Sequence, residues 1–101
     1  HGIAHITGGG LLENTQRILH PAVDLHFERG SWEIPAVFPW LQRLGQIEGE
    51  EMDRVFNMGI GLVLVVSPFL ANTVMDIAKT HGLRPFVIGD TTEGTGQSRW
   101  K

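Results

Sequence analysis

Three consecutive glycines near the amino terminus are the feature of this sequence with the clearest chemical potential. They follow a short apolar run at residues 3–7 and precede an expected helix that begins at Leu11. Because Gly8, Gly9 and Gly10 lack Cβ atoms, their N–H groups can approach an anion closely and their φ angles can be positive. The start of the helix adds free N–H groups and a partial positive charge. We therefore predict an anion-binding loop, most simply for phosphate.

Polar side chains flank this triplet. Thr7 supplies a hydroxyl donor, and we expect His5 and Asn14 at the edge of the same loop. His5 is also the one acid–base candidate beside it. The segment is neither a P-loop nor a dinucleotide fingerprint, because it lacks the Lys-Ser/Thr pair and the G-x-G-x-x-G spacing. A tight turn in which the glycines only let the helix pack on the sheet stays open as the alternative.

A second glycine-containing segment precedes the longest apolar run, residues 59–66. Asn57 can donate and accept hydrogen bonds at once, and it tolerates left-handed geometry. Gly59 and Gly61 indicate a close backbone approach or an unusual turn. From the residues alone we favour a helix end followed by a bulge, and a loop that supports the first segment stays open as the alternative.

Other kinds of site are less well supported. The five histidines share no i, i+4 helical pair, so we predict no zinc site. The chain has no cysteine, which excludes disulfides and thiolate metal ligands. No serine lies in the G-x-S-x-G elbow of a serine hydrolase. We interpret Glu50, Glu51 and Asp53 as the solvated acidic start of a helix, where the helix dipole favours negative charge.

The composition is that of one globular domain. The 101 residues, with 42% hydrophobic and 19% charged, are enough for one core. A net charge of -3 without a basic run argues against nucleic acid as a partner. No apolar run approaches the ~20 residues of a membrane span. Because the sequence opens without Met, directly on its most distinctive segment, we expect residues 1–101 to be one domain of a longer, cytoplasmic protein.

Hydrophobic periodicity predicts alternating strands and helices. The apolar run 59–66 is expected to form a central strand buried on both faces. Ser67 and Pro68 are typical of a helix start, and the inner stripe of that helix would be Ala71, Val74, Met75 and Ala78. We predict strands over 3–7, 22–27, 59–66 and 84–89, helices over 11–19, 35–44, 48–56 and 67–82, and a loop or hairpin with a frayed end over 91–101.

This order predicts an α+β fold in which helices pack on one mixed sheet. A split βαβ arrangement of the ferredoxin-like kind is the natural topology. Trp32 and Trp40 are expected in the core or against another domain. Together with Phe38, the segments of these two tryptophans supply more aromatic surface than so small a core hides, so we predict an exposed apolar face that favours self-association.

Two strings carry a resemblance to a known family. H-I-T-G-G-G-L-L-E-N at 5–14 and F-N-M-G-I-G at 56–61 resemble the signature segments of phosphoribosylformylglycinamidine cyclo-ligases, also called aminoimidazole ribonucleotide synthetases. The resemblance extends to about Gly94, and Pro39 departs from it only at the start of a helix. Further positions that fit the family pattern are Trp32, Pro35, Phe38, Trp40, Leu41, Gln42, Gly45, Glu51, Met52 and residues 87–89.

The resemblance implies the carboxyl-terminal domain of a two-domain, homodimeric enzyme of de novo purine biosynthesis. Such an enzyme uses ATP and Mg²⁺, bound mostly by the amino-terminal domain, to close formylglycinamidine ribonucleotide into aminoimidazole ribonucleotide. The carboxyl-terminal domain would close over the cleft. The isolated chain would then fold without catalysing ring closure. The alternative from another class is a free-standing phosphometabolite-binding or regulatory module without catalysis.

The resemblance also gives roles to the glycine-containing segments. Thr7 and the three glycines would bind a phosphate of the substrate or the nucleotide, with Asn14 and Asn57 as polar supports. Gly59 and Gly61 would shape the supporting loop. His5 would act in acid–base chemistry or in orienting the substrate, and no residue is assigned as the catalytic base.

Overall fold

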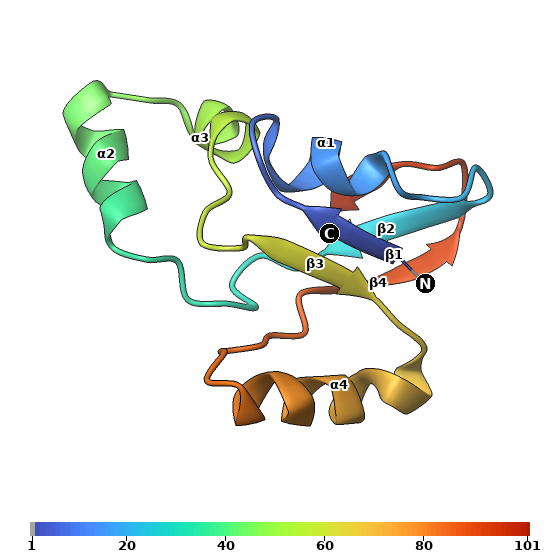
Figure 1. Cartoon of the computed structure of the whole chain (residues 1–101). Coiled ribbons are helices and arrows are strands. Elements are labelled where there is room, and N and C mark those ends of the chain that lie inside the picture. Colours follow the sequence, from blue (N-terminus) through green and yellow to red (C-terminus); the bar gives the residue numbers. More distant parts are fainter. Residues whose placement is uncertain (1) are drawn as a thin grey trace.

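The computed structural model describes residues 2–101, and Figure 1 shows its helices and strands. His1, one of the five histidines considered above, lies outside the described residues. The α+β class is confirmed. The elements in chain order are β1 (Gly2–His5), α1 (Gly10–Gln16), β2 (Val23–Phe27), α2 (Val37–Gly45), α3 (Gly49–Val55), β3 (Leu62–Val65), α4 (Pro68–Thr80), β4 (Gly89–Glu93) and β5 (Ser98–Trp100).

The described strands form two sheets. β1 pairs with β3 in antiparallel orientation, while β2 lies between an antiparallel β4 and a parallel β5. The sequence predicts one continuous sheet in a split βαβ arrangement, and the structure instead divides the strands between these two sheets. The second sheet is mixed, because β2 has neighbours running in both directions.

The strand predicted over 84–89 is wrong, since regular pairing begins only at Gly89. Phe27, the last residue of β2, is the partner of Gly89. Residues before Gly89 therefore extend past the end of β2 and have no ladder to join, whatever their β propensity. A single hydrogen bond, from the Glu28 N–H to the Ile88 carbonyl at 2.8 Å, continues the pairing.

The frayed carboxyl terminus predicted for 91–101 is also wrong. β4 and β5 do not form a hairpin with one another but lie on opposite edges of β2. Trp100 packs against Phe27 and stacks on Trp32, with ring centroids 6.0 and 6.1 Å away. The Arg29 guanidinium lies over the Trp100 ring, 3.9 Å from its centroid, in a cation–π contact. The end of the chain is thus part of the packed structure.

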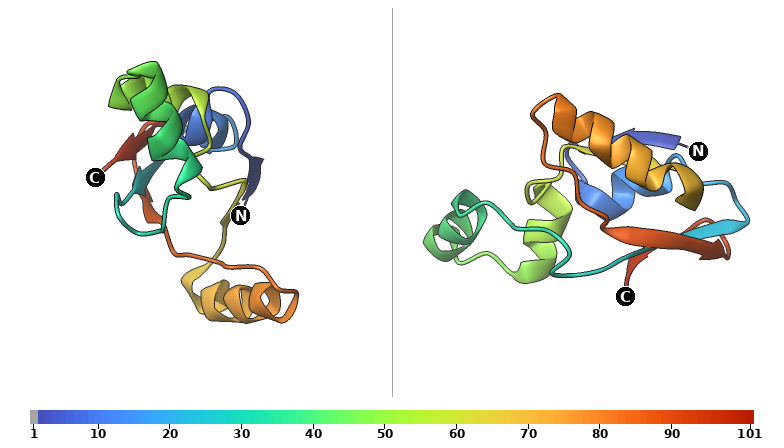
Figure 2. Two further views of the ribbon diagram at one scale, coloured as in Figure 1. Left: turned by 90° about the vertical axis from the view of Figure 1, so that its left-hand side faces the viewer. Right: turned by 90° about the horizontal axis from the view of Figure 1, so that it is seen from below.

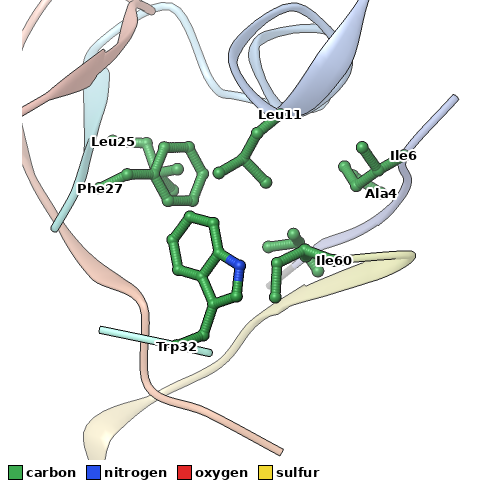
Figure 3. Close-up of a cluster of buried hydrophobic side chains, with 8 residues drawn as sticks. Ala4, Ile6, Leu11, Leu25, Phe27, Trp32 and Ile60 are labelled. Atoms are coloured by element: carbon green, nitrogen blue, oxygen red, sulfur yellow. The ribbon is translucent and has the colours of Figure 1, made fainter. Parts of the chain in front are cut away.

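The hydrophobic core lies between the two sheets, and Figure 3 shows its side chains. Leu25 and Phe27 of β2 are buried in this core, and Asp24 before them is buried as well. Trp32 is buried as well, and its Nε1–H donates to the Met58 carbonyl at 3.0 Å. The buried members of the cluster are Ala4, Ile6, Leu11, Leu25, Phe27, Trp32, Ile60 and Val63.

Strand β3 is not the doubly buried central strand that its composition predicts. Val63 is buried, but the side chains of Leu62 and Leu64 are 57% and 43% exposed. Within the described residues β1 is the only strand that pairs with β3, and the large side chains that this two-stranded sheet turns away from the core are exposed. Ile3, the cross-strand partner of Leu64, lies exposed beside it. Apolar surface therefore remains open on this face.

Helix α4 begins as the sequence predicts. The Ser67 Oγ accepts a hydrogen bond from the Phe69 N–H at 3.3 Å, and Pro68 occupies the first turn. The expected inner stripe of Ala71, Val74, Met75 and Ala78 is half-buried, yet no residue of α4 is fully buried. Figure 2 shows the helix along one side of the molecule, apart from α1, α2 and α3.

The expected exposed apolar surface is present, but its members differ from those predicted. Trp40 is 52% exposed and Phe38 is half-buried, whereas Trp32 belongs to the core. Phe69 on α4 is 94% exposed and adds to the apolar surface of the molecule. The self-association that this surface favours stays a prediction.

Asp24 on β2 holds the connection between β4 and β5. Its Oδ1 accepts hydrogen bonds from the N–H groups of Thr95 and Gln97 at 2.8 and 2.9 Å, and its Oδ2 accepts from Arg99 Nη2 at 3.1 Å. The N–H of Gln97 and then that of Thr95 lower the pKa of the Asp24 carboxyl, with help from the Arg99 charge and against the effect of burial.

This lowered pKa predicts how stability depends on pH. Asp24 stabilises the fold above its unfolded pKa of about 3.9, and this contribution disappears as the pH falls through the lower folded pKa. Asp24→Asn should lower the urea midpoint at neutral pH, and the difference from the parent chain should shrink below about pH 4. Urea unfolding across this pH range measures it. A difference that stays constant with pH would contradict the prediction.

Candidate functional site

The glycine loop, residues 7–10, joins β1 to α1 through a tight turn. Gly9 has φ 101° and Gly10 has φ 73°, both in the region that favours glycine. The Gly10 N–H donates to the Thr7 carbonyl at 3.1 Å, which closes the turn. Within residues 2–101, the N–H groups of Gly8 and Gly9 have no such acceptor. The positive φ angles expected here are therefore confirmed at two of the three glycines.

Asn14 organises this loop from its buried side. Its Nδ2 donates to the carbonyls of Thr7, Gly8 and Gly10 at 3.2, 3.3 and 2.7 Å. Its Oδ1 accepts from the Thr7 hydroxyl at 3.2 Å and from Arg17 Nη1 at 3.0 Å. The sequence places Asn14 at the edge of the anion site, and the structure shows that its polar atoms are all engaged in shaping the loop.

The three glycines differ in what surrounds them. Gly8 is exposed, and a Cβ there would meet nothing within 4 Å. A Cβ on Gly9 would lie 2.7 Å from the Glu13 Oε2, at the end of a flexible side chain. A Cβ on Gly10 would overlap the carbonyl oxygen of Asp53 in α3. The purely structural alternative therefore holds for Gly10, which lets α1 pack on the backbone of α3.

The electrostatics beside Gly9 are mixed. The Glu13 carboxylate, which would repel an anion, forms an ion pair with Arg17 at 3.0 Å. Both side chains are more than half exposed, so water screens this pair. Arg17 thus supplies a positive charge at the loop, shared between Glu13 and the Asn14 amide oxygen.

The second segment forms an unusual turn, as the sequence predicts. The Asn57 Oδ1 accepts from the Gly59 N–H at 2.8 Å, and the Asn57 carbonyl accepts from the Ile60 N–H at 3.0 Å. The positive φ angles fall on Met58 at 54° and Gly59 at 99° rather than on Asn57. A Cβ on Gly59 would lie 2.5 Å from the Pro35 Cδ, so this glycine permits close packing.

A link between the two segments runs through the backbone. The Ile6 N–H donates to the Gly61 carbonyl at 2.9 Å and so continues the β1–β3 pairing up to the glycine loop. Thr7 and Asn57, predicted from separate motifs, consequently line one cavity of about 230 Å³. Its remaining walls are the apolar side chains of Ile6, Phe38, Val55 and Phe56.

The aromatic walls of this cavity are the part that sequence reasoning missed. Phe38 at the start of α2 and Phe56 after α3 meet edge to face, with centroids 5.9 Å apart and rings inclined by 61°. Phe56 is the first residue of the second resemblance string, directly before Asn57. Its place in that string could have identified it as a lining residue of the site. Phe38 lies 18 residues before Phe56, and no spacing rule brings these two rings together.

His5 stands apart from the cavity. It is exposed on β1, opposite Leu62, and its neighbours Ala4 and Ile6 point into the core. Side chains alternate along a strand, so His5 lies on the outer face of the β1–β3 sheet with Ile3. Its predicted place at the edge of the glycine loop is therefore not supported by the cavity lining, although the acid–base role itself stays a prediction.

Comparison with known proteins places these segments in a family. Residues 1–101 match the family described as "AIR synthase related protein, C-terminal domain". A relative from Geobacillus kaustophilus is 46% identical over 97 residues, which cover 96% of this chain and 28% of the relative. One from Pseudothermotoga lettingae is 47% identical over 94 residues, covering 93% of this chain and 28% of the relative.

A plant relative, from Vigna unguiculata, is 48% identical over 95 residues, covering 94% of this chain and 24% of the relative. The two bacterial relatives carry the name "Phosphoribosylformylglycinamidine cyclo-ligase", and the plant name adds "chloroplastic/mitochondrial". The chain thus spans about a quarter of the length of the curated relatives it matches. The family resemblance of the two motif strings is confirmed, and the chain belongs to the AIR synthase related family as a carboxyl-terminal domain.

Proposed function

We propose that this chain serves as the carboxyl-terminal domain of an ATP-dependent cyclo-ligase that converts formylglycinamidine ribonucleotide to aminoimidazole ribonucleotide in purine biosynthesis. The names of the relatives and the family match support this assignment. The observation that carries it is the meeting of Thr7 and Asn57, from the two signature strings, at one cavity. Each string alone is open to a structural explanation, and their convergence favours a shared ligand.

In this proposal the glycine loop binds a phosphate of the substrate or the nucleotide. The N–H groups of Gly8 and Gly9 are the donors, and Asn14 holds the loop in the required shape. Arg17 adds positive charge close to the loop. Gly10 keeps α1 seated on α3, so that the first turn of α1 stays beside the loop.

The remaining partners belong to the longer protein. Among residues 2–101, no three His, Cys, Asp or Glu side chains gather as a metal site would require. We assign ATP and Mg²⁺ mainly to the amino-terminal domain, as the resemblance implies. A homodimer and a cytoplasmic location complete the proposal. Within the same residues, no helix has the length and apolar character needed to cross a membrane.

A chimera with a relative tests this function, because the relative supplies the rest of the enzyme. In the Geobacillus kaustophilus relative, the 97 aligned residues would be replaced by this chain. We expect the chimera to release ADP in a reaction that requires formylglycinamidine ribonucleotide. A soluble, folded chimera that lacks this reaction would contradict the proposal. If the isolated chain nevertheless bound phosphometabolites, the non-catalytic module would take its place.

Gly9→Val in the same chimera tests the glycine loop. A β-branched side chain resists φ 101°, and its Cβ would overlap the Glu13 carboxylate, so both the loop and Glu13 would have to shift. Each lost charge-assisted contact should cost about 1.5–3 kcal/mol, so losing two would weaken phosphate-bearing ligands by on the order of a hundredfold. Stability should fall by only ~1–3 kcal/mol. Ligand titration beside urea unfolding measures both.

Gly8→Ala is the matched control for this variant, because its Cβ meets no neighbour. It should leave stability almost unchanged and weaken phosphate binding less than Gly9→Val does. If Gly9→Val instead lost stability while ligand affinity stayed constant, the loop would be a packing turn only, and the predicted phosphate role would be wrong.

A further inference from the structure

We propose that Arg29 is a positioning residue for the glycine loop and for the Asn57 turn, residues 57–60, and that it acts through Asp53 of α3. This inference rests on the proposed function, because it concerns how the two motif segments are held at one cavity. Arg29 lies just after β2 and does not line that cavity. Its side chain meets α3 and β5 instead.

Helix α3 is the element that the two motif segments share. Gly10 packs closely against the carbonyl oxygen of Asp53, so the glycine loop is seated on the last turn of α3. The chain leaves α3 at Val55 and continues directly into Phe56 and Asn57, which line the cavity. A displacement of α3 would therefore move the seat of the loop and part of the cavity wall together.

Arg29 links α3 to the last strand of the described chain. Its Nη2 donates to the Asp53 Oδ2 at 2.8 Å. Fully exposed ion pairs contribute little, but the Asp53 side chain is only 18% exposed, so water screens this pair less. The same guanidinium lies over the Trp100 ring, 3.9 Å from its centroid. Arginine can make both contacts at once, because its guanidinium is planar and carries several donors.

A second link runs from Trp100 to the residue that follows Asn57. Trp100 stacks on Trp32, and the Trp32 Nε1–H donates to the Met58 carbonyl at 3.0 Å. Both links therefore start at Trp100. One ends four residues before Asn57, and the other ends one residue after it. Residues 53–58 are thus held at both ends, and the Asn57 side chain reaches the cavity from between these two points.

The chimera with the Geobacillus kaustophilus relative tests this role by steady-state kinetics. Arg29→Gln removes the ion pair and the cation over Trp100. We expect the KM for the ligand whose phosphate occupies the loop, formylglycinamidine ribonucleotide or ATP, to rise on the order of tenfold, because ligand contacts are sensitive to small misplacements. The kcat should change by less than about twofold. A merely structural role would show the opposite pattern, since a smaller folded fraction lowers kcat and leaves KM unchanged.

Further variants test the path through Asp53. Arg29→Lys keeps the charge without the planar fork, so its KM should be intermediate. Asp53→Asn should raise KM as Arg29→Gln does, and the double variant should be no worse than either single one, because both remove the same link. Additive effects would overturn the path. Arg84→Gln is the matched control: Arg84 pairs with Glu33 and lies over Phe86 but lines no part of the cavity, so its KM should stay unchanged.

Hydrogen exchange supplies a readout that does not need activity. In Arg29→Gln, the amides of Gly59 and Ile60, which donate to Asn57, should exchange several-fold faster, while the amide of Leu25 in β2 keeps its rate. Equal acceleration at Leu25 would mean a general loss of stability and would count against the inference.

The two readouts separate failure of this inference from failure of the proposed function. An inactive parent chimera would contradict the proposed function, and the exchange pattern would still decide the role of Arg29. An unchanged KM in an active chimera, or unchanged exchange at Gly59 and Ile60 in an inactive one, would overturn that role. If Arg29→Gln does not fold, Arg29→Lys is measured in the same two ways and should show the same changes to a smaller extent.

Discussion

Replacing Gly10 with alanine should lower the free energy of unfolding by about 3–5 kcal/mol, the sum of a strained backbone position and a steric overlap. The residue has φ 73°, and its new Cβ would overlap the Asp53 carbonyl oxygen. Because that neighbour is backbone, it cannot swing aside, and α1 would have to move off α3. Domains of this size are stable by only about 5–15 kcal/mol, so the variant should be close to unfolded.

Gly8→Ala is again the control, since it adds the same methyl group two residues earlier. Its φ is not positive and its Cβ would meet open space, so the change should stay within about 0.5 kcal/mol. Urea unfolding followed by circular dichroism compares the two variants directly. Equal losses at Gly8 and Gly10 would mean that α1 does not rest on the backbone of α3 as described.

Asn14→Ala should have the second largest effect, a loss of about 2–4 kcal/mol together with weaker phosphate binding. The substitution removes the donor shared by three loop carbonyls and the acceptor of the Thr7 hydroxyl. Leaving buried polar groups without partners costs about 1–3 kcal/mol each, and water would replace some of the lost bonds at this partly exposed loop. The affinity for ribose 5-phosphate should fall because the loop is no longer held in shape.

The measurement combines urea unfolding with hydrogen exchange of the amides at residues 7–10, which should exchange faster in the variant. Asn14→Asp is the informative comparison, because it retains an acceptor for Thr7 and Arg17 but has no Nδ2 donor. A loss below about 1 kcal/mol for Asn14→Ala, with unchanged exchange in the loop, would show that the asparagine is not what organises it.

Local patterns predicted those parts of the fold that local forces decide. The Ser67-Pro68 helix start follows from capping and is confirmed, whereas the expected inner stripe of α4 is only half-buried. Strand propensity failed at residues 84–88, because the end of β2 at Phe27, a feature distant in sequence, determines where its partner can begin.

The outward exposure of β3 has a similar origin. A run of Leu and Val predicts burial on both faces, but only Val63 of β3 is buried, while Leu62 and Leu64 face away from the core and are exposed. At the candidate site the residue types of Thr7 and Asn57 pointed to polar chemistry. The sequence did not reveal that Asn14 turns inward to hold three carbonyls, since that depends on how tightly residues 7–10 curl.

The parallel pairing of β5 with β2 also bears on how the chain is made in the cell. Leu25 and Ser98 are partners, although 73 positions separate them, and Trp100 from the same strand stacks on Trp32. A polypeptide emerging from the ribosome exposes β2 long before β5 has been made. The nascent chain must therefore keep Leu25 and Phe27 from aggregating until β5 has left the ribosome, which makes folding of this domain depend on a late pairing of distant residues.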